Sequence, residues 1–223
     1  MSHCGQPEIH GHAEGASRIV YLHGFASGPR SNKARFFRER LERSGATVQV
    51  PDLAAGDFEH LTITGQLALV REAVGNGPAD LIGSSMGGYL AALFAARHNA
   101  VRRVVLLAPA FGFARRWAEQ LGNEKIDQWR RAGWMEVFHY AYGEPRRLSY
   151  ALLEDAAQYE DYPDFHQPAR IFHGRHDDVV PSAYSVEFAA SHPNACLEVL
   201  ESSHELLNVL DDIGPKVEKF LLG

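Results

Sequence analysis

The chain has 223 residues, 45% of them apolar and 22% charged, and this apolar fraction excludes an intrinsically disordered protein. A chain of this length buries about 70% of its unfolded surface, so it folds without disulfide or metal staples. Its 22 basic and 28 acidic residues give a net charge of −6. No basic excess points to nucleic acid or an anionic membrane, so we expect neither as a partner.

The first 17 residues show no hydrophobic periodicity, and we interpret them as a flexible tail that precedes a single domain over residues 18–223. Four side chains able to bind a metal fall in this tail: His3, Cys4, His10 and His12. Their spacing matches no known metal site, so we expect no bound metal.

Three observations indicate a cytoplasmic protein. Its N-terminal segment lacks the apolar stretch of a secretory signal, and the longest uncharged run, 81–96, is too short to span a bilayer. Its two cysteines, Cys4 and Cys196, cannot form a disulfide framework, which favours a reducing compartment.

From residue 18 onward, short apolar runs alternate with longer amphipathic segments. The apolar runs predict strands buried on both faces, at 18–23, 46–50, 79–83, 103–108, 169–173 and 196–200. The amphipathic segments predict helices at 31–44, 61–74, 86–97, 149–159, 182–190 and 206–222. This alternation predicts an α/β fold, with a mostly parallel sheet of about six strands flanked by helices.

The alternation lapses between about residues 110 and 164, where all three tryptophans lie. We interpret 111–165 as a small aromatic-rich insertion on the sheet. Within it, 134–140 predicts a strand, 142–145 a turn, and 146–149 a short strand that pairs back. The insertion either packs a small core of its own or covers a substrate pocket. In the second case we expect three of its side chains to contact substrate: Phe111, Trp117 and Trp134.

The strongest chemical signal is Gly83-Ser84-Ser85-Met86-Gly87, which matches G-x-S-x-G. It follows a predicted buried strand and begins a predicted helix, which is the strand–turn–helix setting of a nucleophile elbow. The turn is so tight that side chains at Gly83 and Gly87 would collide. Ser85 is therefore the predicted nucleophile, at the carboxyl end of the sheet, whereas Ser84 is interpreted as structural.

A serine hydroxyl needs a base to take its proton, and in this setting the chain order is serine, carboxylate, histidine. Two adjacent carboxylates, Asp177 and Asp178, follow the predicted strand at 169–173, and the spacing favours Asp177. His204 follows the last predicted strand at its carboxyl end, and we favour it as the base. Five of the other histidines that follow Ser85 lie in less suitable places: His139, His166, His173, His176 and His192.

The remaining part of such a site is an oxyanion hole. One donor is expected to be the backbone N–H of Met86, the residue after the nucleophile. The second is expected in the loop after the first strand, where Gly24 allows a close approach to the elbow and the Phe25 N–H is the predicted donor. His23 precedes this loop, and we interpret it as structural.

These motifs resemble the α/β-hydrolase superfamily of serine esterases. The segment Tyr21-Leu22-His23-Gly24-Phe25-Ala26-Ser27-Gly28-Pro29, continued by Arg30-Ser31-Asn32-Lys33-Ala34, is especially similar to the small bacterial YqiA-type esterases. The resemblance covers about 18–108 and 168–222. The acid-loop pattern H-G-x-x-D-x-x-V-P implies Asp177 as the triad acid, and S-S-H implies His204 as the base. The insertion is closer in style to the small cap of cinnamoyl esterases.

We therefore expect a carboxylic-ester hydrolase that acts through an acyl-enzyme on small to medium apolar or aromatic esters, with no cofactor and no metal. Two alternatives stay open. One is a thioesterase or acyl-protein thioesterase with the same triad, and the other is a non-catalytic binding protein on the same scaffold.

Overall fold

The computed structural model describes residues 17–223. Residues 1–16, with the four side chains considered as metal ligands, lie outside the described part. The centre of the molecule is a six-stranded sheet, and every neighbouring pair of its strands is parallel. Its strand order is β2-β1-β3-β4-β7-β8. The strands are β1 (Arg18–Leu22), β2 (Thr47–Gln49), β3 (Ala79–Ser84), β4 (Val101–Leu107), β7 (Ala169–Gly174) and β8 (Ala195–Leu200).

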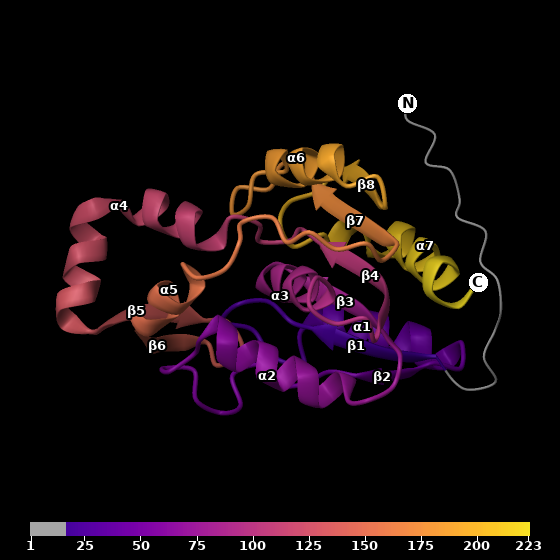
Figure 1. Cartoon of the computed structure of the whole chain (residues 1–223), viewed down its shortest axis with the longest axis horizontal. Helices are drawn as coiled ribbons and strands as arrows, with labels where there is room; N and C mark the ends of the chain where they lie inside the picture. The colour runs from indigo at the N-terminus through magenta and orange to yellow at the C-terminus, as the bar shows by residue number, and fades with distance from the viewer. Residues whose placement is uncertain (1–16) are drawn as a thin grey trace.

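Helices cover both faces of this sheet (Figure 1). Side chains alternate between the faces along each strand, so Ile19 and Tyr21 pack with α1 and α7, whereas Val20 and Leu22 pack with α2 and α3. Burial on both faces explains the nearly continuous apolar runs of the inner strands, whereas the edge strands β2 and β8 are partly exposed, contrary to the prediction. The helices are α1 (Asn32–Arg43), α2 (Ile63–Val74), α3 (Met86–Ala95), α6 (Ala183–Ser191) and α7 (Leu210–Leu222). A 3-10 turn, Leu207–Val209, precedes α7.

Every strand and helix predicted for the core is present, with small shifts at the ends. The fold class predicted from the alternation is confirmed. Because all six strands are parallel, the loops that follow β1, β3, β7 and β8 leave the sheet at one edge. This edge carries each residue that the sequence nominated for catalysis.

The insertion forms a small unit beside the sheet (Figure 1). It contains α4 (Phe113–Ala132), the antiparallel pair β5 (Trp134–His139) and β6 (Glu144–Ser149), and α5 (Ala151–Ala156). The hairpin matches the prediction, although its turn begins earlier, after His139. The helix α4 was not predicted, and α5 is shorter than expected.

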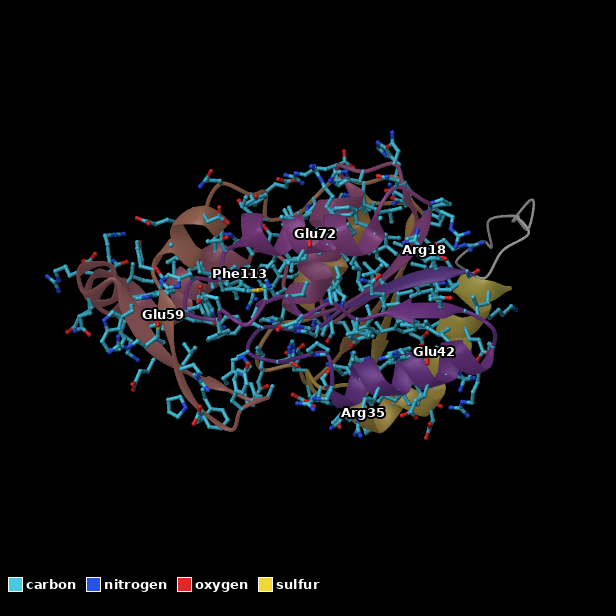
Figure 2. All side chains as sticks on the ribbon, turned by 90° about the horizontal axis from the view of Figure 1, so that it is seen from below. Arg18, Arg35, Glu42, Glu59, Glu72 and Phe113 are labelled. Carbon is cyan, nitrogen blue, oxygen red and sulfur yellow. The ribbon has the colours of Figure 1, made fainter. Side chains whose placement is uncertain are left out.

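Side-chain and backbone hydrogen bonds hold the insertion together and fix it to the core. Within it, the Trp129 indole N–H donates to the Leu148 carbonyl oxygen at 3.0 Å. At its edge, the Ser149 N–H donates to the carbonyl oxygen of Glu59 at 2.7 Å. Figure 2 shows Glu59 beside the insertion and Phe113 where the insertion meets the core. The buried side chains of the insertion, such as Trp129 and Leu148, belong to the same hydrophobic cluster as Val20 and Leu22 of β1, so the insertion shares the core of the domain.

Candidate active site

The nucleophile elbow is built where β3 ends and α3 begins. Ser85 is the single residue between them, and its backbone has φ 53° and ψ −117°, a left-handed conformation that is strained for a residue with a side chain. Its N–H donates to the Leu107 carbonyl oxygen at 2.9 Å, and its carbonyl oxygen accepts from the Ala110 N–H at 3.0 Å. The end of β4 thus holds the strained turn in place.

Two glycines make this turn possible. A side-chain carbon on Gly83 would collide with the carbonyl oxygen of Gly87, on the first turn of α3. A side-chain carbon on Gly87 would collide with the Leu22 carbonyl oxygen at the end of β1. These contacts give the physical reason for glycine at both positions of the G-x-S-x-G pattern.

The structure brings Ser85, His204 and Asp177 into one hydrogen-bonded series. The Ser85 hydroxyl is 3.0 Å from His204 Nε2, and His204 Nδ1 is 2.7 Å from Asp177 Oδ2. The loop after β8 carries His204, and the loop after β7 carries Asp177. The His204 side chain is 14% exposed, so its ring is partly accessible to solvent.

Asp177 lies in a buried, well-satisfied position. Its Oδ1 accepts from the backbone N–H groups of Val179 at 2.9 Å and Val180 at 2.7 Å, while its Oδ2 faces two imidazoles. Burial opposes ionisation, but hydrogen bonds from His173 and His204 outweigh it, and the pKa of Asp177 lies well below its usual range. The carboxylate is therefore charged at neutral pH. Asp178, the adjacent alternative, is exposed.

The loop after β1 passes directly over the elbow. A side-chain carbon at Gly24 would stand 3.5 Å from Ser85 Cβ and 3.5 Å from the Ser84 carbonyl oxygen. Met86 begins α3, so its N–H is one of the helix N-terminal donors that have no acceptor within the helix. Phe25, the other predicted donor, lies in the loop next to Gly24. One nominated amide thus belongs to the residue after Ser85, and the other to the residue after Gly24.

His23 fixes the start of this loop. Its Nε2 accepts from the Leu53 N–H at 3.1 Å, so the ring proton is on Nδ1, which donates to the Gly24 carbonyl oxygen at 2.9 Å. Burial lowers the pKa of His23, which keeps the imidazole neutral. The structural role expected for His23 agrees with these contacts.

Aromatic side chains from the insertion cover the oxyanion loop. The Trp117 ring on α4 meets the Phe25 ring edge-on, with centroids 5.2 Å apart. The Phe25 ring also lies 5.4 Å from that of Phe58, which in turn packs against His139 of β5 at 4.5 Å. Of the three aromatic residues nominated for substrate contact, Trp117 is the one that touches a predicted oxyanion residue.

The other two nominated aromatics have different surroundings. The Phe111 side chain is fully buried, and its ring stacks on Phe188 of α6 at 4.4 Å. Trp134, at the start of β5, is 38% exposed and lies under the Arg147 guanidinium at 4.1 Å. These contacts give Phe111 a core position and Trp134 a place on the outer surface of the hairpin.

Two cations support the loops that carry the acid and the base. Arg116 of α4 donates to the Val179 carbonyl oxygen at 2.9 Å and to that of Phe111 at 3.0 Å, which ties the acid loop to the insertion. Lys33 of α1 donates to the His204 carbonyl oxygen at 3.5 Å. Burial lowers the pKa of Lys33, while neighbouring Glu205 and Asp177 oppose that shift.

His173 is the functional candidate that sequence reasoning missed. The residue was considered as a base and set aside, but its ring Nε2 contacts the predicted triad acid, Asp177, at 3.0 Å. The signal was the first position of the H-G-x-x-D pattern, whose contact with the acid is visible only when the loop is folded.

The residues described here hold no group of three or more histidine, cysteine, aspartate or glutamate side chains suited to a metal ion. None of the helices in residues 17–223 combines the length and apolarity that crossing a membrane requires.

A parallel six-stranded sheet, a serine elbow after its third strand along the chain, and an acid and a histidine after its last two strands define the α/β-hydrolase fold. The chain belongs to the uncharacterised protein family UPF0227, whose model matches residues 18–221.

Known proteins agree with this assignment. The chain is 27% identical to 2-hydroxymuconate semialdehyde hydrolase of Pseudomonas putida, over 86% of this chain and 81% of that one. A putative hydrolase from Agrobacterium vitis has a TM-score of 0.80 at 24% identity, with 92% of this chain and 88% of that one covered. Est1E of Butyrivibrio proteoclasticus, with ferulic acid bound, has a TM-score of 0.78 at 22% identity, covering 94% and 90%. The structural similarities show the fold, and the sequence relative is a hydrolase.

Proposed function

We propose that this protein is a serine hydrolase of carboxylic esters, with Ser85 as nucleophile, His204 as general base and Asp177 as the acid that orients it. The observation that carries the proposal is the hydrogen-bonded series from the Ser85 hydroxyl through His204 to Asp177, with distances of 3.0 and 2.7 Å. Both distances are within the range in which a base can take a proton from a hydroxyl.

The reaction begins when Ser85 Oγ attacks the ester carbonyl carbon and its proton passes to His204 Nε2. The carbonyl oxygen becomes an oxyanion that the Phe25 and Met86 amides bind, close to the positive end of α3. His204 then gives its proton to the alcohol oxygen as the carbon–oxygen bond breaks. A water molecule, deprotonated by His204, hydrolyses the acyl-enzyme and releases the acid.

Asp177 supports both proton transfers. It holds the Nδ1–H tautomer of His204, so Nε2 is free to accept, and its negative charge stabilises the imidazolium that forms. The burial of the carboxylate strengthens this interaction, because water does not screen it.

The substrate class is inferred from what covers the site. Phe25, Phe58 and Trp117 present aromatic rings at the oxyanion loop, which favours an ester with an apolar or aromatic acyl or alcohol group. The structural similarity to Est1E, whose structure has ferulic acid bound, supports the same choice. Trp117 is the aromatic side chain that we retain as a proposed substrate contact.

A fluorophosphonate probe tests the nucleophile. Wild-type protein should be labelled, Ser85→Ala should not, and Ser84→Ala is the matched control because that buried hydroxyl lies next to the elbow. We expect the control to keep its labelling. A folded wild-type protein that fails to label would contradict the proposal and favour a non-catalytic scaffold, and labelling of Ser85→Ala would move the nucleophile.

The acyl bond is tested separately. Rates for matched oxyester and thioester pairs with the same acyl group should give the higher kcat/KM for the oxyester. A preference for the thioester would change the reaction to thioester hydrolysis while leaving the triad in place.

A further inference from the structure

The carboxylate of Asp177 has a second imidazole partner that the mechanism above does not use. His173 is the fifth residue of β7, and its side chain is fully buried. Its Nε2 is 3.0 Å from Asp177 Oδ2 and 2.8 Å from the Val180 carbonyl oxygen. His204 Nδ1 lies 2.7 Å from the same carboxylate oxygen, so two histidines share one oxygen atom of the triad acid.

The neighbours of His173 determine where its proton is. Both atoms that face Nε2 are acceptors, so Nε2 carries a hydrogen and donates it to Asp177 and to Val180. On the other side of the ring, Nδ1 lies 2.7 Å from the hydroxyl of Ser185, a fully buried residue of α6. A neutral imidazole satisfies this arrangement when the Ser185 hydroxyl donates to Nδ1.

We propose that His173 is a positioning residue that holds the Asp177 carboxylate in the orientation that His204 requires, with Ser185 fixing the ring of His173. The hydrogen bonds then run from Ser185 to His173 to Asp177 on one side, and from Ser85 through His204 to Asp177 on the other. This inference rests on the proposed function, because it assigns a role relative to the triad.

The geometry explains why a second donor is useful at this carboxylate. The N–H groups of Val179 and Val180 hold Oδ1, but they do not prevent the carboxylate from turning about that oxygen. The hydrogen bond from His173 to Oδ2 prevents this turn. The His173 ring belongs to β7 and is hydrogen-bonded to Ser185 of α6, so it keeps Asp177 at a fixed position relative to these two elements. Burial with every polar atom paired is the arrangement expected of a group that orients another.

The charged and titratable groups around Asp177 come from four elements. His173 lies on β7 and His204 follows β8, while Lys33 of α1 and Arg116 of α4 contribute favourable charge interactions. Loss of the His173 donor leaves the negative charge of Asp177 less well satisfied. The carboxylate then holds protons more strongly, which moves the acidic limb of activity to higher pH.

The test uses the full-length protein with His173→Leu, which removes the donor, and His173→Gln, whose side-chain amide restores an N–H donor near the position of Nε2. His192→Leu is the matched control. It removes another buried histidine, whose ring stacks on Phe188 at the end of α6. Measured quantities are kcat and KM for an aryl ester, the pH profile of kcat/KM, and the folded fraction from thermal unfolding.

For His173→Leu we expect kcat to fall about tenfold or more, in line with the cost of misplacing a catalytic group by a fraction of an ångström, with little change in KM. The acidic limb of kcat/KM should move to higher pH. His173→Gln should recover most of kcat and return the limb toward its original position. His192→Leu should change stability but leave the limb unmoved.

The inference is overturned if His173→Leu loses activity only in proportion to its unfolded fraction and keeps the wild-type limb. If His173→Leu does not fold, Ser185→Ala gives the answer, because it keeps the imidazole but frees its ring. That variant should lower kcat and move the limb in the same direction, and an unchanged profile would contradict the proposal. A wild-type protein that hydrolyses no ester and takes no fluorophosphonate contradicts the proposed function instead.

Discussion

Replacing Asp177 with asparagine tests the triad acid without changing the size of the side chain. The carboxylate receives four N–H groups, two on Oδ1 from Val179 and Val180, and two on Oδ2 from His173 and His204. An asparagine has one acceptor oxygen and one donor NH₂ group. Whichever way the amide is turned, its NH₂ group faces atoms that donate in the native protein.

We expect the asparagine to turn its NH₂ group toward the imidazoles and its oxygen toward the backbone N–H groups. A histidine can change tautomer and accept from the NH₂ group, whereas a backbone N–H can only donate. The NH₂ group then donates to His204 Nδ1, and the ring hydrogen of His204 moves to Nε2. A protonated Nε2 cannot accept the proton of Ser85. In serine proteases this wrong tautomer lowers kcat about 10⁴-fold. The same factor corresponds to about 5.5 kcal/mol of lost transition-state stabilisation.

The assay is steady-state hydrolysis of an aryl ester by wild type, Asp177→Asn and Asp178→Asn, with the folded fraction of each protein measured alongside. Asp178 is the control because it is exposed and adjacent. We expect a loss of several thousandfold or more for Asp177→Asn and a small change for Asp178→Asn. An Asp177→Asn protein that keeps a tenth of the activity, or a larger loss for Asp178→Asn, would refute the assignment.

Three further changes test other parts of the structure. Trp117→Ala removes the ring that packs against Phe25, so kcat/KM for aryl esters should fall more than for acetate esters of small alcohols; equal losses would mean that the ring does not select substrates. Gly87→Ala places a carbon against the Leu22 carbonyl oxygen and should lower the free energy of unfolding by about 1–3 kcal/mol, measured in urea, and an unchanged value would show that the turn relaxes. Burial lowers the pKa of His23 in the folded protein, so below about pH 6.5 the unfolded chain binds more protons than the folded one. The free energy of unfolding should therefore decline from about pH 6.5 toward pH 5, and it should decline less in His23→Gln. Equal declines in the two proteins would contradict the buried neutral state.

The core of the fold and the site follow from short, local patterns. The inner strands β1, β3, β4 and β7 are buried on both faces along most of their length, so their apolar runs are visible without knowledge of their neighbours. The elbow is visible because one tight turn forces glycine at Gly83 and Gly87. The sequence could bring Ser85, Asp177 and His204 together as candidates because strand ends in a parallel sheet meet at one edge, so position along the chain predicts position in space.

The helix α4 was missed although its sequence carries a helical signal. Apolar residues recur at Phe113, Trp117 and Leu121, and again at Ile126 and Trp129, with charged residues between them. The two sets do not follow one helical period, because Gly122, with φ 74° and ψ 161°, interrupts the helix between them. A search for a single continuous period therefore fails, while a search on either side of the break would succeed.

Contacts between distant segments are the part that local patterns do not contain. The stacking of Phe111 on Phe188 depends on how α6 packs after β7, some 75 residues later in the chain. The contact between His173 and Asp177 depends on a loop that turns back on the end of its own strand. For such pairs the sequence supplies residues of the right type, but their meeting is a property of the packed structure.

Arg116 and Trp117 are neighbours in the chain, yet they reach two separate loops of the site, one by a hydrogen bond to Val179 and the other by a ring contact with Phe25. The first turns of α4 are therefore a fixed part of the catalytic frame. The second half of α4 and the hairpin β5–β6 follow these two contacts in the chain. That stretch reaches the site through His139 of β5, whose ring packs on Phe58 beside Phe25, so a change in the hairpin is passed to the oxyanion loop through the Phe58 ring.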